Sequence, residues 1–146
     1  MLISILAAAC GGNKPAPEAA PTQGSAVAAE PGMAGEHENL TPELKQFHDV
    51  LAPRYHADKG PARQKQTCDA IPEFSSAAAT IAKAVPPAGT DQQQWTEAAG
   101  ALAASIDTLS TTCKAGDAAK FDADFEALHG NFHKLMETSA KHHDMP

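Results

Sequence analysis

Four stretches of the chain carry large apolar side chains at intervals of three and four residues, separated by short segments rich in proline and glycine. That spacing places the apolar side chains along one face of an α-helix. The stretches cover residues 42–55, 62–84, 91–113 and 117–141. Four amphipathic helices joined by short links predict an all-α fold, an up-down-up-down antiparallel four-helix bundle.

Particular residues mark where these helices begin, bend and end. Thr41 is a good N-cap for the first helix, and Pro42 suits the first helical position. Pro53 is expected to distort the last turn of that helix, because proline removes a backbone donor. Pro72 lies inside the second stretch, so it predicts a kink or the start of a new segment. Gly116 predicts the end of the third helix.

Composition restricts the kinds of protein that this chain can be. Aromatic residues make up 5% of the sequence, which favours closely packed helices over a sheet. The net charge of −7 and the scattered basic residues predict that nucleic acid is not a partner. No apolar run approaches the roughly 20 residues that span a bilayer. Nucleophile elbows, phosphate loops and metalloprotease signatures are missing from the sequence, so we expect no enzyme.

The first third of the chain differs in composition from the rest. Residues 11–38 contain four prolines, five glycines and no aromatic side chain. Such a segment cannot bury enough apolar surface to offset the entropy of ordering, and it predicts a disordered tether. We therefore expect a signal-peptide remnant over residues 1–9, a linker over 10–38 and a folded domain over 39–146.

The residues Ala7-Ala8-Ala9-Cys10-Gly11 follow a short apolar run at the start of the chain. This arrangement resembles the lipobox of bacterial lipoproteins. The resemblance implies export, cleavage before Cys10 and a lipid anchor on the Cys10 thiol. It implies a place on the periplasmic side of the cell envelope, and since Gly11 is not an aspartate, we expect the outer membrane.

Cys68 and Cys113 remain once Cys10 is assigned to the anchor. In an oxidising compartment two thiols in one small domain commonly form a disulfide. A regular hairpin would place Cys68 opposite about residue 107, but a break at Pro72 would let Cys68 approach Cys113. We expect a structural disulfide, and the alternative is two buried, unpaired thiols.

Seven histidines occur in the chain, and all but His37 belong to the first helix, the fourth helix or the tail. His129 and His133 are four residues apart, so both rings leave the same helix face about one turn apart. Because the first and fourth helices are neighbours in the predicted bundle, His48 is a candidate third ligand. Counting residues from the loops places residue 48 of the first helix opposite about residue 125 of the fourth helix, one turn from His129. The same count places His56 well beyond that point along the bundle.

Imidazole-rich sites suit copper or zinc better than calcium or magnesium, so we predict a transition-metal site at His48, His129 and His133, with His56 as a weaker candidate. Asp49 or Glu126 could add an oxygen ligand and Met136 a thioether. The alternative is a structural or interaction lipoprotein whose histidines are half-exposed and hydrated.

The four-helix succession, the central Pro86-Pro87 loop and the run His129-Gly130-Asn131-Phe132-His133-Lys134 resemble the periplasmic four-helix cytochromes of the c′ type and their soluble b-type relative. In the c′ type the matching run is Cys-x-x-Cys-His-Lys, so His133 occupies the iron-ligand position. Both thioether cysteines are replaced here, which leaves only non-covalent haem. The resemblance implies an alternative function, an electron carrier with haem on His133 and His48 as a second axial ligand.

Overall fold

The structure is a computed structural model that describes residues 40–140. Within this range the chain forms five helices and no strand: α1 (Pro42–Tyr55), α2 (Pro61–Asp69), α3 (Ile71–Lys83), α4 (Gln92–Ala115) and α5 (Ala118–Ala140). The all-α prediction is confirmed. The predictions for Cys10, for the tether and for the tail beyond residue 140 lie outside the described residues.

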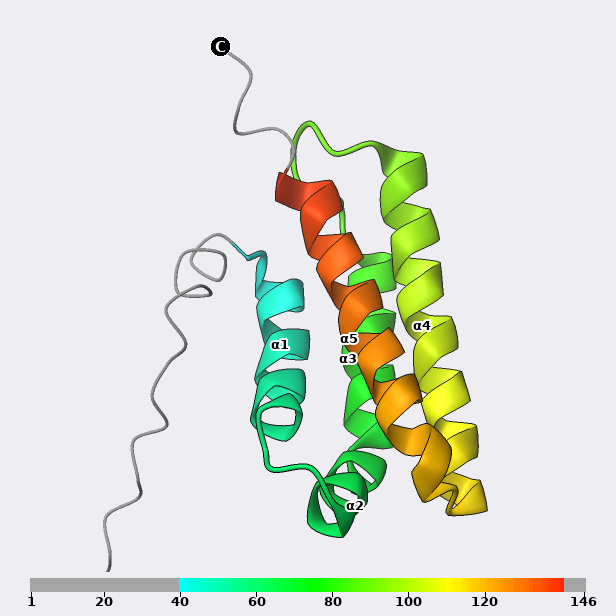
Figure 1. Cartoon of the computed structure of the whole chain (residues 1–146). Helices are drawn as coiled ribbons and strands as arrows, with labels where there is room; N and C mark the ends of the chain where they lie inside the picture. The colour runs from blue at the N-terminus through cyan, green and yellow to red at the C-terminus, as the bar shows by residue number, and fades with distance from the viewer. Residues whose placement is uncertain (1–39, 141–146) are drawn as a thin grey trace, which may run out of the picture.

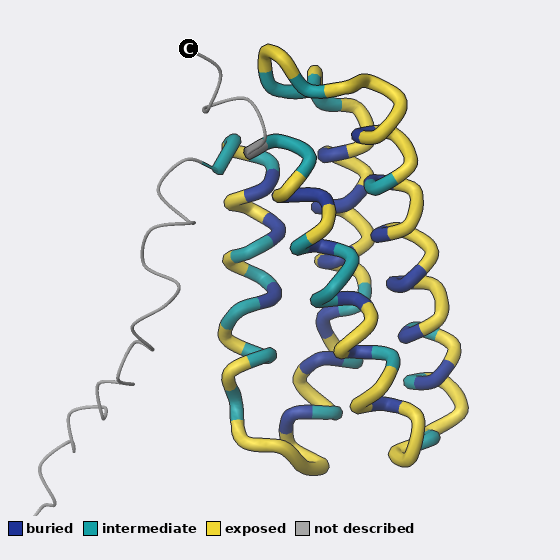
Figure 2. The backbone as a smooth tube through the Cα atoms, turned by 45° about the horizontal axis from the view of Figure 1, so that its top comes forward, coloured by how far each residue is buried: buried dark blue, intermediate teal, exposed yellow. Residues whose placement is uncertain are grey.

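The four longer helices lie along one another, and the short α2 lies at one end (Figure 1). Helix α4 packs against both α3 and α5, and α1 packs against α3 and α5. The dark buried segments in Figure 2 face the middle of the molecule from each long helix. The largest fully buried side chains are Phe47, Phe74, Phe125, Phe132, Leu44, Leu51, Ile81, Leu102, Ile106, Leu109, Leu128 and Leu135.

The prediction of one helix over residues 62–84 is wrong, because the chain forms two helices with a break at Ala70, and the new segment predicted at Pro72 is confirmed. The Ala70 N–H donates to Thr67 O at 3.1 Å, a tightened terminal turn, and α3 begins at Ile71 with Pro72 in its first turn. Proline has no N–H to continue the preceding helix, so the break falls where Pro72 requires it.

This break lets α2 approach the far end of α4. Cys68 and Cys113 form a disulfide with their Cα atoms 5.5 Å apart, so the predicted pairing is confirmed. The bridge joins α2 to the last turn of α4 and fixes the position of α2 relative to the longer helices.

The helix ends follow the expected local chemistry. Thr41 caps α1 by accepting a hydrogen bond from Leu44 N at 3.4 Å. The Asp91 carboxylate caps α4 by accepting one from Gln94 N at 2.8 Å. Gly116 ends α4 with φ of 65°, a left-handed conformation that glycine adopts without strain. Helix α1 continues past Pro53 to Tyr55. Nowhere in residues 40–140 is a helix both long and apolar enough to cross a membrane.

Candidate metal site

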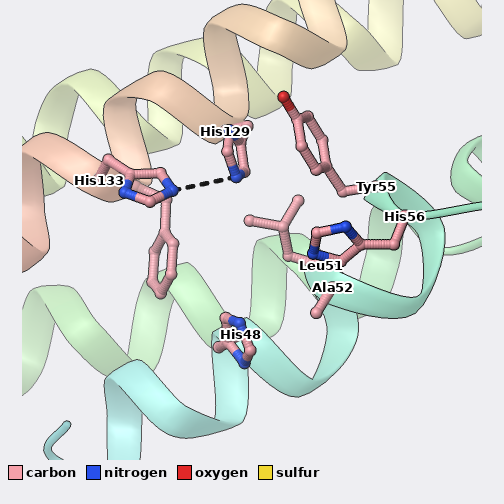
Figure 3. Close-up of a pocket in the computed structure, with 8 residues that line it drawn as sticks. His48, Leu51, Ala52, Tyr55, His56, His129 and His133 are labelled. Carbon is pink, nitrogen blue, oxygen red and sulfur yellow. Dashed lines mark hydrogen bonds between the residues drawn. The ribbon is translucent and has the colours of Figure 1, made fainter. Parts of the chain in front are cut away.

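A small pocket lies between the C-terminal half of α1 and the middle of α5 (Figure 3). Its walls are His48, Leu51, Ala52, Tyr55, His56, His129, Phe132 and His133. The structure thus brings all four of the predicted ligand histidines to one place, three of them half-buried and His56 exposed.

His129 and His133 form the closest pair in the pocket. They lie one turn apart on α5, and their Nε2 atoms are 3.0 Å apart, as the dashed line in Figure 3 shows. One of these nitrogens donates a proton to the other, so one ring must be the Nε2–H tautomer and the other must offer a lone pair. The two imidazole nitrogens therefore face each other across this hydrogen bond.

His129 is held between neighbouring rings in a partly apolar setting. The Tyr55 ring stacks on it with ring centroids 3.6 Å apart and planes within 10°. Burial lowers the pKa of His129 to about 4, helped by the nearby His133 and opposed by the Glu126 carboxylate. At neutral pH this imidazole is uncharged, which is the state that binds a metal ion.

Tyr55 is positioned by contacts at both its ends. Its hydroxyl donates to the two Glu126 carboxylate oxygens, at 2.9 Å each. Burial raises the pKa of Tyr55, and the Glu126 carboxylate raises it further. Its carbonyl oxygen accepts a hydrogen bond from Arg63 Nη1 at 3.4 Å. Arg63 is 5% exposed, pairs with Asp122 and lies over the Phe125 ring at 5.6 Å.

Sequence reasoning missed these roles of Tyr55 and Arg63. Tyr55 continues the apolar stripe of α1, which gave its ring a core position without indicating the stacking on His129. Arg63 carries no local signal, because its burial depends on α1, α2 and α5 meeting at one point. An arginine in an otherwise polar short helix is indistinguishable from a solvated one in the sequence.

The register between α1 and α5 differs from the one predicted by counting. His48 lies opposite Phe132, with ring centroids 6.2 Å apart, whereas it was predicted level with residue 125. Tyr55 instead packs against Phe125, at 5.8 Å between ring centroids. Counting along ideal helices failed because the break at Ala70 changes the path from α1 to the other helices. As a result His56 lies at the pocket, its ring 5.6 Å from that of Tyr55.

The other predicted donors are engaged elsewhere. The Asp49 carboxylate accepts from Lys45 Nζ at 2.8 Å, Glu126 accepts from Tyr55, and Met136 is buried in the core. Across residues 40–140 no three histidine, cysteine, aspartate or glutamate side chains are close enough to hold one ion together. Convergence is therefore limited to the His129–His133 pair, with His48 and His56 on the facing helix.

The size of the pocket decides which group its residues fit. Its volume of about 10 Å³ matches one water molecule or one metal ion. Phe132 stacks on Phe47 at 5.0 Å between ring centroids, and both rings are buried, so no space on the scale of a haem lies beside them in this pocket. The cavity therefore has the size of an ion or a water molecule and not that of a haem.

Known proteins add no further constraint to this site. No family model matches the chain, and neither curated proteins nor solved structures show significant similarity to it. The chemistry of the pocket therefore carries the functional argument by itself.

Proposed function

We propose that this protein binds a transition-metal ion, copper or zinc, at the His129–His133 pair, with His48 and His56 as additional imidazoles across the pocket. The observation that carries the proposal is the 3.0 Å approach of the two Nε2 atoms within a pocket that four histidines line. Histidines that were merely solvated would have no reason to share a cavity the size of an ion.

The geometry of the pair supports this proposal. Imidazole nitrogens bind zinc or copper at about 2.0–2.1 Å, so two of them on one ion lie roughly 2.9–3.4 Å apart at right or tetrahedral angles. The observed 3.0 Å falls within that range. An ion would take the place of the single proton that the two nitrogens share, once the rings turn so that both lone pairs point to one place beside the line that joins the nitrogens.

The surroundings of the pair support it as well. The stacked Tyr55 ring restricts His129, so less side-chain entropy is lost when an ion binds. The lowered pKa of His129 means that protons compete weakly for its lone pair at neutral pH. His48, on the facing helix, reaches the ion only after a change in its side-chain position, so we assign it a secondary role.

We propose that this function operates on the periplasmic side of the cell envelope, at the outer membrane. The proposed anchor is a lipid on Cys10, followed by residues 10–38 as a tether and an up-down-up-down helical bundle that carries the site. The Cys68–Cys113 disulfide supports an oxidising compartment. A tethered, stoichiometric metal binder there would act as a scavenger or chaperone of copper or zinc.

Elemental analysis of the full chain, purified without a His-tag or nickel column, tests the proposal. We expect near-stoichiometric copper or zinc, and its loss in the His129→Gln/His133→Gln variant, whose fold is checked by circular dichroism. His142→Ala/His143→Ala is the matched control, because it removes two imidazoles from outside the described residues. Absence of metal even after reconstitution would overturn the proposal, and iron with a haem spectrum would establish the cytochrome-like alternative.

A further inference from the structure

We infer that the ion this site selects is monovalent copper, Cu(I), in preference to Zn(II) or Cu(II). The inference rests on the proposed function, since it names the ion that the same histidine pair would hold. Three properties of the pocket carry it: the charge of the donors, their number and the apolar character of one wall.

The first property is that the donors are neutral. Only imidazoles among the pocket residues offer nitrogen or oxygen lone pairs to an ion, apart from the Tyr55 hydroxyl. The Glu126 carboxylate lies beside the pocket, and both of its oxygens accept from the Tyr55 hydroxyl. An ion bound at His129 and His133 therefore has no anionic ligand, and Glu126 acts on its charge only through space.

The second property is that the pocket is half-buried and has one apolar wall. Leu51 and Phe132 are each 1% exposed, and together with Ala52 they form the wall beside the histidines. The cost of moving an ion out of water grows with the square of its charge, so a divalent ion costs roughly four times as much as a monovalent one of similar size. Uncompensated charge in this setting favours Cu(I).

The third property is the small number of donors. Zinc sites in proteins are almost always tetrahedral, and Cu(II) prefers a square-planar or tetragonal set. Within residues 40–140 only two nitrogens converge, and the cavity of about 10 Å³ leaves little room for additional waters. Cu(I) accepts two or three ligands, so it needs fewer donors than Zn(II) or Cu(II). To hold it, the pair must open from 3.0 Å to roughly 3.5–4.1 Å, the nitrogen spacing of trigonal or linear coordination. A third neutral imidazole leaves the charge argument unchanged.

The experiment compares metals on the same full-length protein. Every sample carries Cys10→Ser, because a free thiol in an unlipidated chain would itself bind Cu(I). Cu(I) is supplied without oxygen, and its affinity is measured by competition with bicinchoninate. Zn(II) and Cu(II) affinities are measured by competition with chelators suited to each. Thiol reductants are left out so that the Cys68–Cys113 disulfide stays intact.

We expect one Cu(I) per chain, with copper K-edge absorption showing two or three nitrogen neighbours. His129→Gln/His133→Gln should weaken Cu(I) binding by more than about 100-fold, since loss of outer-shell partners alone typically costs 10–100-fold. His142→Ala/His143→Ala should leave it unchanged. Zn(II) or Cu(II) bound through His129 and His133 more tightly than Cu(I) would overturn this inference and leave the proposed function standing. No binding of any of the three ions would remove both.

Discussion

Helix α5 packs against α1 on one side and against α4 on another, and we call these two helix interfaces the α1–α5 seam and the α4–α5 seam. The two seams differ in the side chains that line them. The seam with α1 contains stacked rings and imidazoles around a cavity of about 10 Å³. The seam with α4 borders a far larger and more open hollow of about 370 Å³. That hollow is lined by small residues: Ala101, Ala104, Ser105, Thr108, Asp124, Ala127 and Asn131.

The comparison teaches that the proposed site is distinguished by its lone-pair donors rather than by its volume. In the α4–α5 seam the polar groups already have partners: the Thr112 hydroxyl donates to the Asp124 carboxylate, Ser105 donates to Leu102 O, and Asn131 donates to Ala101 O. In the α1–α5 seam two nitrogens have only each other and a shared proton. The proposed ion would therefore take the place of a shared proton in the smaller space.

The largest effect on this comparison should come from removing the disulfide. Cys68→Ala/Cys113→Ala opens a loop with a sequence separation of 45 residues, and the chain-entropy relation gives a loss of about 4 kcal/mol in the free energy of unfolding. Urea denaturation measures it. Because Arg63 on α2 donates a hydrogen bond to the Tyr55 carbonyl of α1, loosening α2 should also loosen α1. Amide hydrogen exchange should therefore rise more in α1 than along the α4–α5 seam. Equal increases in both seams would show that α2 does not support the metal site selectively.

A smaller loss should follow from Arg63→Met, which breaks the link between α2 and Tyr55. Arg63 is nearly buried but Asp122 is about half exposed, so we expect a loss of about 2 kcal/mol, below the usual cost of breaking a fully buried pair. Arg54→Met is the matched control on α1, since its partner Glu73 is well exposed, and it should cost under about 1 kcal/mol. Similar losses in the two variants would contradict a positioning role for Arg63.

These two predictions rest on features that the sequence revealed unequally. The disulfide and the helix break follow from Cys68, Cys113 and Pro72, because proline chemistry acts locally. The His129–His133 pair follows from the helical repeat alone. The register of His48 against α5 could not be predicted, since small errors in the loops and in α2 add up along the chain. The buried position of Arg63 requires three helices to be placed together, which no local pattern encodes.

The pH dependence of stability should arise from the α1–α5 seam and not from the α4–α5 seam. The pKa of His129 is lowered from 6.5 to about 4, so the unfolded chain binds a proton there more readily than the folded chain. Stability is therefore full above about pH 6.5 and falls as the pH drops through about 4. Allowing for partial exposure, the loss is on the order of 1–2 kcal/mol.

Urea midpoints measured between pH 7.5 and 4 check this prediction. His129→Gln should flatten the curve, while Asn131→Ala, on the next seam of the same helix, should leave its slope unchanged. The groups that act on His129 are His133, Glu126, His56 and His48. An unchanged slope in His129→Gln would mean that one of these other groups, rather than His129, carries the dependence.

The smallest effect should come from Tyr55→Phe, which keeps the ring stacked on His129 but removes the hydroxyl that holds Glu126. One partly exposed hydrogen bond contributes about 1 kcal/mol, and Thr112→Val, which removes the Asp124 contact of the other seam, should cost a similar amount. The two variants should differ at His129. A Glu126 released from Tyr55 can approach the imidazole and raise its pKa, as a nearby negative charge does. NMR titration should show that rise in Tyr55→Phe and no change in Thr112→Val. A shift in both variants would mean that the seams are coupled through α5, and their separation into a structural and a metal-binding side would fail.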